Sequence, residues 1–250
     1  MKANPDKFHL LLSDPDEELS INIDNFEIKN THCQKLLGIT LDNKLKLNTH
    51  VTNLCRKASQ KLHALSRVSH YMTHKQRKII MQSFILSQFG YCPLVWMLHS
   101  RKLNTRINKL HERALRLVYQ EENTTFEELL KKDESFTIHE RNIQTLGIEL
   151  YKVAYGLAPE IMRQVFPCNP QGKYPWDNIF QTFNVKTTSW GLESLGHLGP
   201  RIWSLIPMGM KKLSLSKFSK EIRNWKPDKC PCTMCKTYIQ NLGYVVVSTQ

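Results

Sequence analysis

Three cysteines close to the C-terminus have the spacing of a metal-binding motif. Cys230, Cys232 and Cys235 form a C-x-C-x2-C run. Three thiolates this close together can share one soft cation, for which zinc is the usual choice. A structural zinc site almost always takes four ligands, and neither Cys nor His follows Cys235 in the sequence. His197 or Cys168 could complete the set only by folding back onto the run. The alternative is an incomplete site made of three ordinary thiols.

Motifs for hydrolytic or phosphoryl-transfer chemistry do not occur in the sequence. There is no G-x-S-x-G, no H-E-x-x-H and no glycine-rich phosphate loop. Paired carboxylates in an apolar strand, which a two-metal site would need, are missing as well. Six histidines lie in or beside one basic helical region, where we expect them to extend a weakly basic surface or to be satisfied at helix ends. They are His50, His63, His70, His74, His99 and His111. The sequence therefore predicts no catalytic site.

Positive charge is concentrated in one quarter of the chain. Between Arg56 and Arg116 there are thirteen Lys and Arg against one acid, Glu112, a local net charge of +12 out of +13 for the whole chain. A field of one sign over so short a stretch favours an anionic partner.

The basic residues fall on stripes when the stretch is drawn as helices with about 100° per residue. Apolar residues at similar spacing occupy the opposite faces, and like charges on one stripe repel unless an anion lies along them. The pattern predicts contact with nucleic acid, and the alternative is an ordinary solvated basic surface. The predicted contact residues are Arg56, Lys57, Lys61, Arg67, Lys102, Arg106, Lys109, Arg113 and Arg116.

Composition narrows the class of protein. The first twenty residues are rich in acids and contain no secretory signal, so we expect an intracellular protein that is not secreted. Seven cysteines, an odd number, fit a reduced compartment. The most apolar run, 79–98, is interrupted by polar residues, Gly90 and Pro93, which predicts a buried bent helix and no membrane span.

Periodicity predicts strands first and helices afterwards. Residues 7–42 alternate apolar and polar side chains, with a strand at 8–12 and a hairpin around Asp24-Asn25. Helices follow at 49–69, 74–90 and 101–119, and capping boxes begin at Thr73, Thr125 and Thr137. The last box opens a helix that ends near Gly156 and Pro159. Its predicted core residues are Ile143, Leu146, Leu150, Val153 and Leu157.

The order of these features resembles the C-terminal part of reverse transcriptases from non-LTR (LINE-type) retrotransposons. The run KLLGITLD at 35–42 resembles the end of the palm, and LHERALR at 110–116 resembles the thumb. Further likenesses, including PRIWSLIP at 200–207, extend over nearly the whole chain. The segments that match, in chain order, are 4–10, 35–42 with His50, 86–96, 110–116, 126–130, 139–142, 151–152, 200–207 and 225–235.

The resemblance implies a role in RNA-directed DNA synthesis. The basic helices would hold a template–primer duplex of RNA and DNA, and Leu37-Gly38 would be the turn that grips the primer end. The polymerase aspartates of the family, and the Mg²⁺ they bind, belong to a part of the palm N-terminal to the matching residues. We therefore expect a fragment that is inactive alone and acts in the nucleus or the cytoplasm.

Together these observations predict an α+β chain that is predominantly helical. Residues 1–48 would be a small palm remnant, 49–120 a basic thumb-like domain, 121–166 a helical post-thumb region and 167–250 a loop-rich region with the cysteine tail. Two alternatives remain: a basic nucleic-acid-binding module without an enzymatic parent, and a protein-interaction module whose helices bind an acidic partner.

Overall fold

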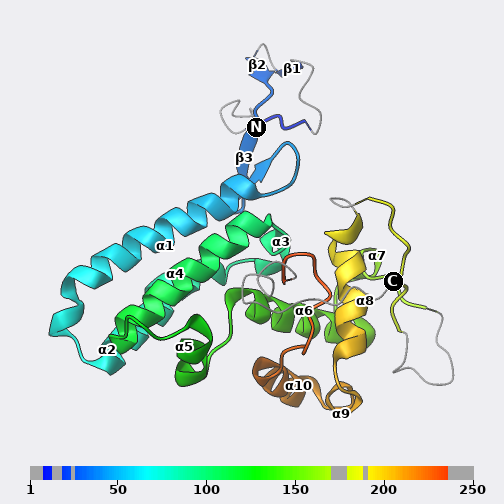
Figure 1. Cartoon of the computed structure of the whole chain (residues 1–250). Coiled ribbons are helices and arrows are strands. Elements are labelled where there is room, and N and C mark those ends of the chain that lie inside the picture. The colour runs from blue at the N-terminus through cyan, green and yellow to red at the C-terminus, as the bar shows by residue number, and fades with distance from the viewer. Residues whose placement is uncertain (1–7, 13–18, 24–25, 170–178, 188–190, 236–250) are drawn as a thin grey trace.

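Two small β-ribbons precede a mainly helical body (Figure 1). The computed structural model describes residues 8–12, 19–23, 26–169, 179–187 and 191–235. Strand β1 (Ser20–Ile23) pairs antiparallel with β2 (Phe26–Lys29), and β3 (Cys33–Leu36) pairs antiparallel with β4 (Ile39–Asp42). The predicted α+β class and the hairpin are confirmed, although the turn at Asp24-Asn25 lies outside the described residues.

The predicted strand at 8–12 is wrong. Leu10 forms only an isolated bridge with Asn30. Strand β4 is anchored because Ile39 is buried against α1, whereas Ile21 and Phe26 of the first ribbon are about half exposed. A segment with no apolar layer to cover it gains too little from pairing to extend a ribbon into a sheet.

Two long helices form the framework of the basic stretch. Helix α1 (Asn48–Val68) and helix α4 (Arg101–Tyr119) lie side by side in the same direction (Figure 1). They bury one face each, and the residues of α1 that do so include Val51, Cys55, Ala58, Leu62 and Leu65. Both helices end within a residue or so of the predicted bounds.

An irregular helical segment leads the chain from the end of α1 back to the start of α4. It contains α2 (His74–Ile80), a π-helical turn η3 (Met81–Ile85), a 3-10 turn η4 (Leu86–Phe89) and α3 (Pro93–Trp96). The capping box of Thr73 and Gln76 is present. The predicted single regular helix over 74–90 is not present, because the π turn changes the helical phase. The segment buries Met81, Ile85, Leu86 and Phe89.

The C-terminal half packs around α6 (Ile138–Ala154). Helix α5 (Phe126–Asp133) precedes it, and α7 (Ile161–Val165), α8 (Leu195–Leu205), α9 (Met208–Lys211), α10 (Leu215–Glu221) and η6 (Ile222–Asn224) follow. Both predicted capping boxes, at Thr125 and Thr137, are present. Leu157 was expected in the core but is 57% exposed, because α6 ends at Ala154 and Gly156 turns the chain with φ 68°.

Two hydrophobic cores meet at the start of α6. Ile138 belongs to the core formed by α1, α4 and α5, whereas Ile143, Leu146 and Leu150 belong to the core formed with α8 and α10. Among the described helices, none is long and apolar enough to cross a membrane.

A close helix contact at Gly199 gives a test of this packing. A Cβ atom there would lie 2.6 Å from Cε1 of the buried Phe166 ring, so we expect Gly199→Ala to lower the free energy of unfolding by about 1–3 kcal/mol. Gly209 in α9 has nothing within 4 Å of the same position. Gly209→Ala should therefore raise that free energy by about 0.4–1 kcal/mol. Urea denaturation followed by circular dichroism measures both, and equal changes would contradict the packing.

Candidate metal centre and basic groove

The metal centre begins with the first turn of α6. Thr137 is the N-cap: its hydroxyl accepts from the backbone N–H of Glu140, and the Glu140 carboxylate accepts from the backbone N–H of Thr137. This reciprocal pair fixes the start of the helix. His139 therefore lies in the first turn, and its side chain points into the protein with only 5% of the residue exposed.

The C-terminal tail follows α6 back to this turn. Phe218 and Ile222 are fully buried in the core around α6. Beyond them, Gln144 donates from Nε2 to the carbonyl of Trp225 at 2.9 Å, and Lys226 pairs with Glu140 at 3.5 Å. These contacts lead the tail along α6 toward its N-terminus, where the three cysteines reach His139.

The four side chains form one compact donor set. His139 Nε2 lies 3.4 Å from Cys230 Sγ and 3.3 Å from Cys232 Sγ. The four donor atoms, including Cys235 Sγ, all lie within 4.8 Å of one another. A tetrahedral zinc ion with bonds of about 2.0–2.1 Å to nitrogen and about 2.3 Å to sulfur would place N and S about 3.5 Å apart. The cluster can therefore hold a metal ion.

A backbone contact supports the same arrangement. The N–H of Cys235 donates to Cys232 Sγ at 3.4 Å. Hydrogen bonds of this kind orient a sulfur ligand and stabilise its negative charge. Cys232 is buried, and the other two thiols are half-buried.

The electrostatics of the cluster favour thiolate. Burial lowers the pKa of His139, but hydrogen bonds to Cys230 and Cys232 and the charge of these sulfurs outweigh it and raise the pKa to about 10. Hydrogen bonds from Cys230 and Cys235 hold the pKa of Cys232 well below its usual value, while contacts with the other two thiols raise that of Cys235. Cys232 is therefore the thiol whose ionisation the cluster favours most. A divalent ion would allow all three to ionise and would displace the imidazole proton.

The fourth ligand differs from the two that the sequence suggested. Ser194 is the N-cap of α8, and its hydroxyl accepts from the backbone N–H of His197, while Cys168 contacts the carbonyl of Phe166. Neither belongs to the donor cluster. His139 was missed because 91 residues separate it from Cys230. Its only local signal is a position in the first turn of a capped helix.

The predicted basic residues border a groove between α1 and α4. Helical geometry, at about 100° per residue, places Arg56 and Arg67 about 140–160° from the buried face of α1. The same geometry places the stripe of Arg106, Lys109 and Arg113 more than about 120° from the buried face of α4. All five side chains are exposed, as is Lys102.

The groove deepens into a cavity near the ends of the two helices. It has a volume of about 450 Å³ and is lined by His63 and Ser66 from α1, by Arg113 and Arg116 from α4, and by Gln120, Glu121 and Glu122, which follow α4. Lys57 and Lys61 lie on the other flank of α1, where Lys61 Nζ is 5.9 Å from the centre of the Phe84 ring. Of the nine predicted residues, Arg113 and Arg116 line this cavity.

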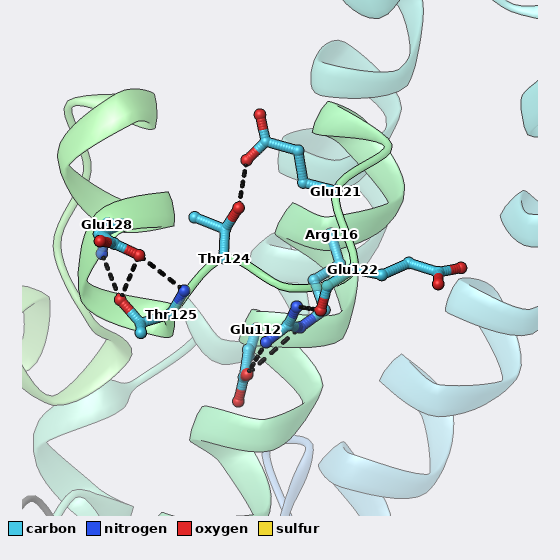
Figure 2. Close-up of polar contacts among 7 residues, drawn as sticks. All are labelled: Glu112, Arg116, Glu121, Glu122, Thr124, Thr125 and Glu128. Atoms are coloured by element: carbon cyan, nitrogen blue, oxygen red, sulfur yellow. Dashed lines mark hydrogen bonds and ion pairs between the residues drawn. The ribbon is translucent and has the colours of Figure 1, made fainter.

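The guanidinium group of Arg116 already contacts two other residues of the protein, Glu112 and Glu122 (Figure 2). Its Nη2 lies 2.7 Å from Glu112 Oε1, and its Nη1 donates to the carbonyl of Glu122. Both side chains of the Glu112–Arg116 pair are 28% exposed. An anion in the groove would have to displace the Glu112 carboxylate from Arg116.

Two further cations of the basic stretch have structural roles. Arg77 is buried and donates to the carbonyls of Ser69, Met72 and Val118, which ties α2 to the ends of α1 and α4. Lys78 pairs with Asp133 at 2.8 Å. The charge available at the surface is therefore smaller than the sequence count of +12.

Of the six histidines, His111 departs from the prediction that they extend the surface or are satisfied at helix ends, because it is buried in the middle of α4. His50 lies in the first turn of α1, and the ring of His99, which follows α3, donates to the carbonyl of Trp96. His50, His99 and His111 are buried. Burial lowers the pKa of His99 to about 4 and that of His111 to about 3, so both are neutral at pH 7. His50 Nδ1 accepts from the backbone N–H of Thr40 and anchors β4 to α1. His63, His70 and His74 are exposed, as expected.

The primer-grip-like residues form the tight turn between β3 and β4. Leu37 and Gly38 both have positive φ, 46° and 87°, and Leu37 is 83% exposed. The Tyr91 hydroxyl donates to the carbonyl of Leu37 at 2.7 Å and holds the turn against the segment before α3. The turn is thus a fixed, solvent-facing feature.

Comparison with family models, with curated proteins and with solved structures gives no match for this chain.

Proposed function

We propose that the chain binds a nucleic-acid duplex along the α1–α4 groove. The observation that supports this most strongly is that two basic stripes, about fifty residues apart in sequence, lie on the neighbouring helices α1 and α4, beside a groove that Arg113 and Arg116 line. Exposed like charges on facing helices repel each other, and a string of phosphates relieves this repulsion. Such contacts fix the position of a duplex without reading its sequence.

We further propose that the duplex is an RNA–DNA template–primer and that the chain is part of a retrotransposon-type RNA-directed DNA polymerase. The order of sequence likenesses supports this, as does the exposed Leu37-Gly38 turn on the segment that leads into α1. The described residues contain no carboxylate group suited to the two-metal chemistry of a polymerase. Their role is therefore duplex binding, and nucleotide addition would need the aspartates and Mg²⁺ of a complete palm.

Charge reversal of the groove tests the binding. The variant Arg106→Glu/Lys109→Glu/Arg113→Glu should weaken binding of an RNA–DNA duplex and reduce the slope of log affinity against log salt. The reduction should be up to about 0.9 for each phosphate that the variant no longer neutralises. Fluorescence anisotropy at several salt concentrations measures both quantities.

The control for this test reverses three exposed charges away from the groove. Lys217→Glu/Lys220→Glu/Arg223→Glu, on α10 and η6, changes the net charge by the same amount. Equal losses in the two variants would show only a general charge effect. Binding of poly-glutamate as tightly as the duplex would favour an acidic protein partner instead.

The Glu112–Arg116 pair gives a prediction of opposite sign. Glu112→Gln removes the carboxylate that holds Arg116 and should strengthen duplex binding several-fold, with a salt slope steeper by up to about 0.9. Glu160→Gln removes an equal charge from an exposed pair with Arg163 on α7 and should leave the affinity unchanged. A Glu112→Gln affinity at or below that of the unmodified chain would contradict a phosphate role for Arg116.

We also propose that the metal of the Cys-His centre is zinc. Three thiolates and one imidazole suit this ion, and the distances between the donor atoms agree with a tetrahedral site. All four positions would be filled by protein ligands, which is typical of structural zinc. Bound zinc would supply no reaction here but would join the tail to α6.

The zinc proposal predicts one ion per chain and a loss of that ion in His139→Ala. Cobalt substituted into the unmodified chain should show thiolate charge-transfer bands that disappear when zinc is added. Chelation should lower Tm, because the ion binds only the folded tail. His197→Ala is the matched control and should keep its metal. A full complement of zinc in His139→Ala, with unchanged cobalt spectra, would refute the fourth ligand.

A further inference from the structure

A cavity beside the Cys-His centre opens part of that centre to solvent. The cavity lies between α4, α5, α6 and the tail and has a volume of about 780 Å³. Exposed residues such as Glu127 and Asp228 line it, so it is open to the surrounding water. Cys230 and Cys235 also line it and are half-buried, whereas Cys232 is only 4% exposed. A small oxidant that enters the cavity can therefore reach two of the three cysteines.

The sulfur atoms of the centre are close enough to react with one another. All of its donor atoms lie within 4.8 Å of one another. The two sulfurs of a disulfide lie about 2.05 Å apart, and rotation of the cysteine side chains can close the remaining gap. Cys33 and Cys92 are more exposed, but neither belongs to this cluster. Exposure alone therefore does not distinguish the cysteines of the centre, whereas proximity does.

The spacing of the three cysteines favours one pair. Cys232 and Cys235 have two residues between them, which is the spacing of the redox-active disulfides in thiol oxidoreductases. The chain turns at 233–234, and the backbone N–H of Cys235 donates to Cys232 Sγ at 3.4 Å. Cys230 and Cys232 have only one residue between them. A loop that short leaves less freedom to reach the narrow range of dihedral angles that a disulfide requires.

We propose that Cys232 and Cys235 are a site of reversible oxidation, at which a peroxide joins the two sulfurs in a disulfide and releases the metal ion. The proposal rests on the Cys-His centre and adds its regulation. Cysteines that bind a metal are deprotonated, and the thiolate is the form of cysteine that a peroxide oxidises.

Two steps complete the oxidation with hydrogen peroxide as the only other reactant. The Cys235 thiolate attacks one peroxide oxygen, the O–O bond breaks, and Cys235 becomes a sulfenic acid as hydroxide leaves. The Cys232 thiolate then attacks Cys235 Sγ, so that the S–S bond forms, the S–O bond breaks and a second hydroxide leaves. In total, two electrons pass from the sulfurs to the peroxide.

Loss of the metal ion follows from the number of ligands that remain. After oxidation only Cys230 and His139 of the donor set keep their binding atoms free, and a structural zinc ion takes four ligands. Reduction of the disulfide restores both thiolates and with them the complete donor set. The metal content of the centre thus depends on the redox state of one cysteine pair.

Treatment of the zinc-loaded chain with hydrogen peroxide tests the proposal. A chromophoric chelator follows released zinc, and alkylation with N-ethylmaleimide followed by mass spectrometry follows each cysteine. Zinc release should keep pace with disulfide formation, Cys230 should stay open to alkylation, and dithiothreitol with added zinc should restore the loaded chain. Retention of zinc and of all three thiols, at a peroxide concentration that oxidises the exposed Cys33 and Cys92, would overturn the proposal.

Two matched variants identify the pair. Cys230→Ser and Cys235→Ser each remove one half-buried ligand that lines the cavity, so both disturb the metal site in the same way. Peroxide should still form a disulfide in Cys230→Ser but not in Cys235→Ser. A disulfide in Cys235→Ser, or the lack of one in Cys230→Ser, would contradict the assignment.

Failure of the zinc proposal gives a different result. A reduced chain that binds no zinc but forms the Cys232–Cys235 disulfide would refute the metal and support the oxidation site. A chain that keeps its zinc under peroxide would refute the oxidation site and support the metal. Duplex binding, measured on the same samples, should not change, because Arg106, Lys109 and Arg113 do not belong to the centre.

Discussion

The burial of α6 between two hydrophobic cores is the constraint on which the rest of the structure depends. Ile138 packs with α1, α4 and α5, and Leu146 and Leu150 pack with α8 and α10. A helix shared in this way cannot shift toward one core without opening the other. The Thr137–Glu140 capping box fixes where it begins. His139 therefore has a defined position between the cores, and the tail only has to follow α6 to reach it.

The distribution of charge follows from the same packing. The buried Arg77 satisfies three backbone carbonyls at the ends of the framework helices, and Lys78 meets the buried Asp133. These two cations stabilise the arrangement of α2, α4 and α5. The cations that remain exposed on α1 and α4 have no such role. Their mutual repulsion is a cost that the fold tolerates.

Local signals in the sequence were sufficient for most of the helical structure. Apolar periodicity located α1 and α4, and the three capping boxes located the starts of α2, α5 and α6, because these features depend on side chains only a few residues apart. The prediction that Leu157 lies in the core failed because the helix ends before it, at the turn that Gly156 makes with positive φ. The strand at 8–12 failed because strand formation depends on a covering layer that local alternation does not reveal.

The candidate sites were less accessible to prediction from the sequence. The spacing of three cysteines indicated a candidate metal centre. The fourth candidate ligand, His139, could not be predicted in this way, because tertiary packing brings together residues 91 positions apart. The basic stripes were visible on a helical wheel. The wheel could not show that Lys61 lies against Phe84, on the flank of α1 where Lys57 also lies, or that Arg116 already forms an ion pair with Glu112. The cavity between α4, α5, α6 and the tail had no local sequence signal, because its wall is assembled from four segments.

Helix α4 contributes residues to the walls of two separate cavities. Arg106, Lys109 and Arg113 occupy its solvent side, and Asn104 and Asn108 occupy a side about 150° away that lines a second cavity of about 780 Å³, which α5, α6 and the tail complete. The two cavities therefore share no residue of α4. The metal centre closes the cavity through the tail but contributes nothing to the groove. Loss of the metal should therefore affect the two sides of α4 unequally, and a fold with a single site would give no reason for that difference.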